Sequence, residues 1–115
     1  MSSPFHDACL EAIRLMALDQ GFRHPASEAT AVWGLFSDPS TPKDEPEGYT
    51  PLTSVEQTEF AAWWFSLSPL ERQIVCCGCV ETESDDVAVM SNDGDIEVHI
   101  PLRFHTTLNV LFDLL

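Results

Sequence analysis

The sequence predicts an α+β fold of about four helices, one β-hairpin and an apolar C-terminal helix. Three observations support this prediction. Apolar residues recur at three- and four-residue steps in most of the first two thirds of the chain, as on the buried face of a helix. Apolar and polar residues then alternate on both sides of Asp93-Gly94, a dipeptide that favours a tight hairpin turn. An almost wholly apolar segment follows the hairpin.

Length and composition indicate a single domain over residues 1–115. At this length one hydrophobic core is expected, and a hydrophobic content of 44% with seven Phe and three Trp can build it. The same content argues against intrinsic disorder. Residues 37–52 differ from the rest because they hold four of the eight prolines and several acids. They are expected to form an exposed, Pro-rich acidic loop.

Two helices are predicted before this loop. Ser3 and Pro4 are typical N-cap and first-turn residues, so the first helix is expected from about residue 4 to residue 20, with Gly21 ending it. The second helix is expected to begin at Pro25. Its inward-facing side chains are Ala29, Val32, Trp33 and Phe36.

Two further helices are predicted after the loop. The third starts at Ser54 with Gln57 in the capping-box position, and its neighbours Trp63 and Trp64 cannot both point the same way. Which of the two is exposed stays open. The fourth has a strong start signal, since Ser68 is followed by Pro69 and, three residues after the serine, by a glutamate. It is expected to end near Gly78.

The hairpin is predicted with strands at about 86–91 and 95–103. A two-residue turn at Asp93-Gly94 pairs Val89 with Val98 and predicts an inward face of Val87, Val89, Ile96, Val98, Ile100 and Leu102. The outward face then holds Asp95, Glu97, His99 and Arg103 with Ala88 and Met90. Thr106 or Thr107 is expected to cap a final helix at 108–115. This helix would cover the hairpin or form a homodimer contact.

Charge is the most unusual property of the chain. Nineteen Asp and Glu against five Lys and Arg give a net charge of −14 and a pI near 4.2. Such a protein repels nucleic acid and anionic membranes, so a basic protein is the expected partner. The sequence shows no signal peptide and no apolar run long enough to span a membrane, which predicts a cytoplasmic protein with reduced thiols.

The acids concentrate between residues 81 and 97, without a single Lys or Arg. Seven carboxylates there are the predicted partner-binding residues: Glu81, Glu83, Asp85, Asp86, Asp93, Asp95 and Glu97. Alternate residues of a strand lie about 6.6 Å apart, so strand and turn carboxylates can approximate a line of backbone phosphates. The alternative interpretation is a solvated face that prevents strand edges from pairing.

Size and charge resemble those of small acidic phage proteins that disable host defences, namely anti-CRISPR and anti-restriction DNA mimics. The resemblance covers composition only, and no family motif carries it. It implies an inhibitor that masks a basic, nucleic-acid-binding surface in a bacterial or phage-infected cell, without a cofactor and without catalysis. A bacterial immunity protein or a secretion chaperone for a basic toxin or effector is the related alternative.

A metal-binding or thiol enzyme is the alternative from another functional class. Cys76, Cys77 and Cys79 are its candidate residues, together with a histidine. Their spacing lacks the second half-site of a structural zinc centre, and buried cysteines commonly serve as small apolar residues. A calcium loop fails because Val89 and Ile100 would occupy its first and twelfth positions, where carboxylates are needed. No phosphate-binding or nucleophile motif is present.

Overall fold

The computed structural model describes residues 3–43, 45, 49–92 and 96–115. Its elements, in chain order, are α1 (Pro4–Asp19), α2 (Pro25–Ser37), α3 (Ser54–Ser66), α4 (Pro69–Cys77), β1 (Cys79–Glu83), β2 (Val87–Ser91), β3 (Glu97–Pro101) and α5 (Leu102–Asp113). The predicted α+β class is confirmed. Within this part of the chain, no helix combines the length and the apolar character needed to cross a membrane.

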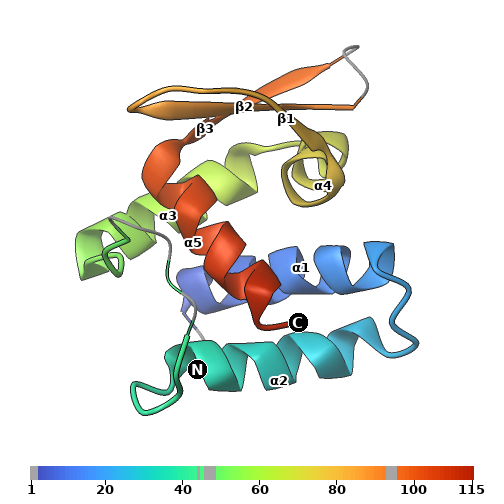
Figure 1. The fold of residues 1–115 in the computed structure, drawn as a ribbon, viewed down its shortest axis with the longest axis vertical. Helices are drawn as coiled ribbons and strands as arrows, with labels where there is room; N and C mark the ends of the chain where they lie inside the picture. The colour runs from blue at the N-terminus through green and yellow to red at the C-terminus, as the bar shows by residue number, and fades with distance from the viewer. Residues whose placement is uncertain (1–2, 44, 46–48, 93–95) are drawn as a thin grey trace.

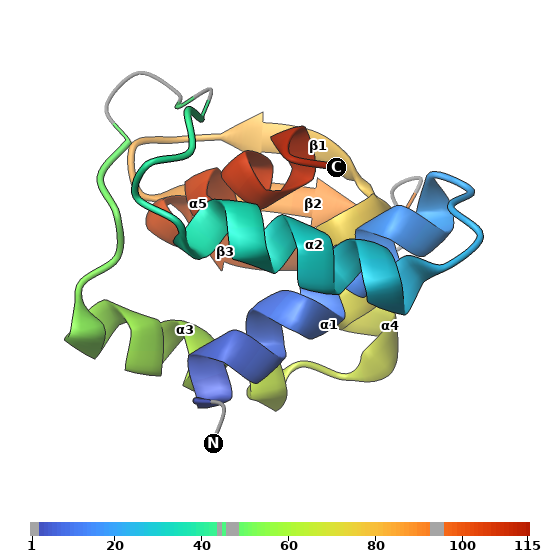
Figure 2. The same cartoon turned by 90° about the horizontal axis from the view of Figure 1, so that it is seen from below.

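The elements form layers (Figures 1 and 2). An antiparallel sheet in the order β1-β2-β3 lies at one end of the molecule. Helices α4 and α5 pack against one face of this sheet, and α3 lies beside them. The pair α1 and α2 lies farther from the sheet, where α1 contacts α3, α4 and α5. The core therefore lies mainly between helices, and the sheet closes it on one side.

Helix starts follow the local signals closely. The Ser3 hydroxyl accepts a hydrogen bond from the His6 N–H at 3.1 Å and caps α1. At α4, Ser68 and Glu71 form the predicted capping box, with hydrogen bonds of 3.2 and 2.8 Å. At α3 the predicted pair of Ser54 and Gln57 is wrong by one residue. Thr53 is the cap and Glu56 completes the box, because Ser54 already has helical geometry.

A carboxylate of α1 ties three helices together. Glu11 accepts a hydrogen bond from the indole N–H of Trp64 in α3 at 2.6 Å and another from Arg72 in α4 at 2.9 Å. Arg72 also donates to the backbone carbonyl of Trp64 at 3.2 Å, near the end of α3. Trp64 is fully buried, Trp63 is half-buried and Phe65 is 47% exposed. The three adjacent aromatic residues thus point in different directions, as helical geometry requires.

The sheet contains a strand that the sequence analysis did not predict. β1 carries two glutamates in five exposed residues, so it lacks the apolar alternation that indicates a strand. It pairs antiparallel with β2, and the register shifts between Val80 and Thr82. This irregularity places Glu81 at a bulge. Charge and a bulge on a strand at the edge of a sheet are common protections against pairing with other chains.

The predicted register of β2 against β3 is wrong by one residue. Met90, and not Val89, lies opposite Val98, and Val89 lies opposite His99. Val98 and Ile100 face the core as predicted, whereas Val87 and Val89 change places with Ala88 and Met90. Such a slip reverses the face of every side chain of one strand.

The last described backbone bond of the hairpin joins the Asn92 N–H to the Ile96 carbonyl at 3.4 Å, which leaves three residues between them. The proposed turn residues Asp93 and Gly94 lie outside the described residues. Ile96, predicted inward, is 38% exposed.

The end of the hairpin also differs from the prediction. The strand stops at Pro101, and α5 begins at Leu102 instead of residue 108. Thr106 and Thr107 lie inside the helix, where their hydroxyls donate to the backbone carbonyls of Leu102 and Arg103. Threonine favours helix caps in general, but this bond to the carbonyl four residues earlier makes it acceptable within a helix. Most apolar side chains of α5 are buried within the chain, so the helix does not require a second subunit to cover it.

Most described residues of the Pro-rich loop are exposed, but its two ends differ from the rest. Ser37 belongs to the last turn of α2, and Leu52 is buried in the core. Tyr49 is half-buried, and Lys43 donates to the carbonyls of Asp38 and Thr41 at 2.8 and 3.2 Å. After Ser37, the described residues of this loop form neither helix nor strand, as expected from the prolines.

Candidate functional site

The structure separates the predicted acidic residues into two groups. Glu83, Asp85 and Asp86 lie where β1 ends and the chain turns into β2. Glu97 lies at the opposite end of the sheet, where it pairs with Ser91, and Glu81 reaches the same residue. Asp93 and Asp95 lie outside the described residues. The carboxylates of the described sheet therefore do not form the single line that the predicted hairpin implied.

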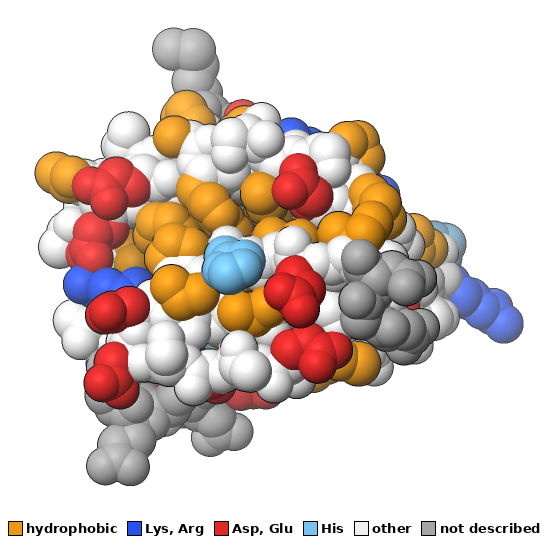
Figure 3. All heavy atoms as spheres, turned by 90° about the horizontal axis from the view of Figure 1, so that it is seen from above, with side chains coloured by type: hydrophobic (Ala, Val, Ile, Leu, Met, Phe, Trp, Pro, Cys, Tyr) orange, Lys and Arg blue, Asp and Glu red, His pale blue; other side chains and the backbone are white. Residues whose placement is uncertain are grey.

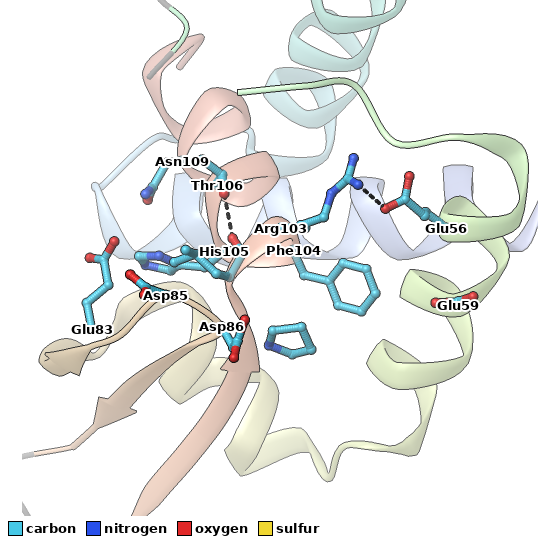
Figure 4. Close-up of a pocket in the computed structure, with 12 residues that line it drawn as sticks. Glu56, Glu59, Glu83, Asp85, Asp86, Arg103, Phe104, His105, Thr106 and Asn109 are labelled. Atoms are coloured by element: carbon cyan, nitrogen blue, oxygen red, sulfur yellow. Dashed lines mark hydrogen bonds and ion pairs between the residues drawn. The ribbon is translucent and has the colours of Figure 1, made fainter. Parts of the chain in front are cut away.

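The first group belongs to a cleft of about 550 Å³ between α3, the end of the sheet and the start of α5 (Figure 4). Glu56 and Glu59 of α3 line its other side. We call this site the acidic cleft and define it by its carboxylates, Glu56, Glu59, Glu83, Asp85 and Asp86. Two segments that are distant in sequence, α3 and the connection from β1 to β2, thus direct negative charge towards one cleft.

Little positive charge balances these carboxylates. Arg103 forms an ion pair with Glu56 at 2.5 Å, and this arginine side chain is 49% exposed. A hydrogen bond from the Thr53 backbone N–H is the main cause that holds the pKa of Glu56 below its usual value. The positive charge of the nearby Arg103 acts in the same direction. No Lys or Arg in the described part of the chain pairs with Glu59, Glu83, Asp85 or Asp86. The acidic cleft therefore keeps most of its charge for an external cation.

His105 of α5 lies at the wall of the acidic cleft, with Glu83 and Asp85 close to its ring (Figure 4). The residue is 7% exposed. Burial lowers the pKa of His105, and the negative charge of Glu83 acts in the opposite direction. The net shift favours the neutral imidazole near pH 7. His105 thus adds a polar group to the cleft without cancelling its charge.

The remaining described acids have different surroundings. Glu81 accepts a hydrogen bond from the hydroxyl of Ser91, which is fully buried in the central strand. This carboxylate therefore satisfies a buried polar group, a structural role that limits its freedom to bind a partner. Glu97 is exposed and makes no such contact.

The three candidate cysteines lie at the junction of α4 and β1. Cys76 packs against the core, Cys77 contacts the Leu15 carbonyl at 3.7 Å, and Cys79 is exposed. Burial raises the pKa of the Cys76 thiol well above its ordinary value and that of Cys77 to about 11. Both thiols are protonated near neutral pH, which disfavours them as nucleophiles. In the described ranges, no group of three or more His, Cys, Asp or Glu residues is arranged to hold a metal ion.

Two of the five carboxylates of the acidic cleft were not predicted from the sequence. Glu56 and Glu59 are three residues apart, so they lie on one face of α3. This spacing is readable in the sequence, but only the fold shows that this face lies opposite the β1–β2 connection. His105 was not predicted as part of this site because the final helix was expected to begin only at residue 108, whereas α5 begins at Leu102.

Comparison of the chain with protein-family models, with curated proteins and with solved structures finds no match in any of the three.

Proposed function

We propose that this protein binds a basic protein and masks a surface with which that protein holds nucleic acid. It would act as an inhibitor by occupying that surface. The observation that carries the proposal is the acidic cleft, in which four carboxylates have no Lys or Arg partner in the described structure. These carboxylates occur in a chain with a net charge of −14.

The shape and charge of the acidic cleft suit Lys and Arg side chains. A concave site that gathers one sign of charge concentrates the electrostatic potential more strongly than a flat surface with the same groups. A groove that binds phosphates presents the complementary pattern of cations, so carboxylates on a rigid frame can compete for it. Long-range attraction would make association fast and would weaken it at high salt.

The proposal is tested by capture of partners from a bacterial lysate at low and at high salt. The test variant is Glu83→Gln/Asp85→Asn/Asp86→Asn. The control variant, Asp19→Asn/Glu28→Gln/Asp113→Asn, removes the same charge from helices α1, α2 and α5, away from the acidic cleft. We expect the wild type and the control to capture a basic protein at low salt, and the test variant to capture much less.

A second measurement tests the inhibitory part of the proposal. The captured protein should lose its nucleic acid when the wild-type protein is added, and the test variant should displace less. Equal capture by the test and control variants would show that the acidic cleft is not the contact. Capture without displacement of nucleic acid would contradict the masking function.

A further inference from the structure

The face of the sheet that points away from the helices has apolar side chains at its centre. We call this the outer face and define it by the side chains of Val87, Val89, His99 and Pro101. Val89 lies opposite His99 and Val87 lies opposite Pro101, and residues paired in this way project to the same side of an antiparallel sheet. Figure 3 shows apolar side chains gathered around a histidine on this side of the molecule. The helices that the structure describes lie together on the other side (Figure 1).

The central strand carries apolar residues on both of its faces. Ala88 and Met90 are buried towards the helices, while Val87 and Val89 are half-buried on the outer face. A sheet with one solvated face usually has polar residues on that side, and apolar residues on both faces are typical of a strand that is covered twice. This distribution indicates a second layer over the outer face.

Carboxylates surround the apolar centre, as the red side chains in Figure 3 show. Glu97 lies at one end of the sheet and Asp85 and Asp86 lie at the other, while residues 79–101 contain no Lys or Arg. This arrangement complements a partner with an apolar patch flanked by basic side chains. A second copy of the chain does not fit, because it would bring a further charge of −14 to the same contact.

The edges of the sheet restrict how a partner can bind. The bulge in β1 interrupts the regular edge that an added strand would need. Pro101 has no N–H to donate at the end of β3, which is the other edge of the sheet. A partner is therefore expected to pack onto the outer face instead of extending the sheet.

We infer that the outer face is a docking surface for a basic protein that covers Val87 and Val89 with apolar side chains and places Lys or Arg against the surrounding carboxylates. The inference rests on the proposed function and adds a second contact to it, with an apolar centre. The acidic cleft attracts the partner, and the outer face provides the apolar surface that is removed from contact with water on binding.

The experiment uses two synthetic peptides of equal length and equal charge, one alternating Lys with Val and the other alternating Lys with Ser. Binding to the full chain is measured by NMR titration at low salt. We expect the Lys–Val peptide to bind more tightly and to shift the methyl signals of Val87 and Val89. The variant Val87→Thr/Val89→Thr should weaken that binding by about tenfold and leave the Lys–Ser peptide unaffected. The control variant Leu18→Gln/Leu35→Gln removes exposed apolar surface from α1 and α2, and should change neither affinity.

Three results would overturn the inference. Equal affinity for both peptides, unchanged by the valine substitutions, would refute the docking surface and leave the acidic cleft as the contact. A dimer in size-exclusion chromatography with light scattering that Val87→Thr/Val89→Thr dissociates would assign the outer face to a second copy. Failure of both peptides to bind at low salt would contradict the inference and the proposed function together.

Discussion

The two faces of the sheet contain similar residues but have different surroundings. On the inner face, Ala88, Met90, Val98 and Ile100 are buried against helices, with at most 6% of each residue exposed. On the outer face, Val87 and Val89 are only half-buried, and His99 is exposed. Hydrophobicity alone therefore does not decide which side chains of β2 enter the core. The register in which β2 pairs with β3 decides which side chains are buried, because a shift of one residue moves every side chain of a strand to the other face.

The difference separates stability from recognition. Inner-face residues lose contacts within the chain when they are shortened, whereas outer-face residues have few such contacts to lose. Substitutions on the two faces should therefore differ in their effect on the free energy of unfolding. Ile100→Ala and Val89→Thr test this difference directly, and two further predictions test the neighbouring packing at Gly78 and His105.

The largest effect is expected for Ile100→Ala on the inner face. Ile100 is completely buried, and removal of its side chain leaves a cavity between β3 and the helices. We expect the free energy of unfolding to fall by about 2–5 kcal/mol, measured by urea denaturation with circular dichroism. A loss below about 1 kcal/mol would show that this face is not packed as described.

A smaller but clear loss is expected for Gly78→Ala, where α4 meets the sheet. A Cβ atom at Gly78 would lie 2.6 Å from the carbonyl oxygens of Ile74 and Ser91, and backbone atoms cannot move aside easily. We expect destabilisation of about 1–3 kcal/mol in the same denaturation experiment. Gly34→Ala is the control, since nothing lies within 4 Å and the added methyl favours helix α2. Equal effects of the two substitutions would refute the close approach at Gly78.

A pH effect is expected from His105, beside the acidic cleft. Burial lowers the pKa of this histidine in the folded state, so the unfolded chain takes up the proton first as the pH falls below about 6.5. His105 therefore contributes stability at neutral pH that is lost under acidic conditions. The decrease in thermal midpoint between pH 7.5 and pH 5.5 should be smaller in His105→Gln than in the wild type. His99→Gln is the control on the exposed outer face, and an equal reduction in both variants would contradict the role of burial.

The smallest effect is expected for Val89→Thr on the outer face. Threonine keeps the β-branched shape that suits a strand. Val89 is also only half-buried, on the face that it shares with the exposed His99. The free energy of unfolding should change by less than about 0.5 kcal/mol in urea denaturation. A loss comparable to that of Ile100→Ala would show that Val89 belongs to the core and would restore the register predicted from the sequence.

Local features of the fold were predictable because their causes are local. Ser3, Pro25 and Ser68 mark the starts of helices within a few residues of sequence, and each start is observed at or beside the expected position. The α+β class follows from the same local patterns. Thr106 was misleading for a related reason, since a residue that usually caps a helix can also bond within one.

Long-range features were not predictable from the same patterns. The register of β2 depends on packing below the sheet, and the larger Val89 looked better suited to the core than Ala88. β1 was not predicted because its two glutamates interrupt the apolar alternation that indicates a strand. For the acidic cleft, Glu83, Asp85 and Asp86 were predicted as binding residues from charge density. Glu56 and Glu59 join them only through the tertiary position of α3.

The placement of the aromatic side chains has a practical consequence for optical measurements. The three tryptophans lie in α2 and α3, and residues 79–101 contain neither Trp nor Tyr. The ring of Trp63 lies 5.4 Å from that of Phe104, which lines the acidic cleft. A ligand in this cleft should therefore alter the intrinsic fluorescence, whereas a ligand confined to the outer face should leave it nearly unchanged. The protein thus contains its own fluorescent reporter for distinguishing occupancy of the acidic cleft from occupancy of the outer face.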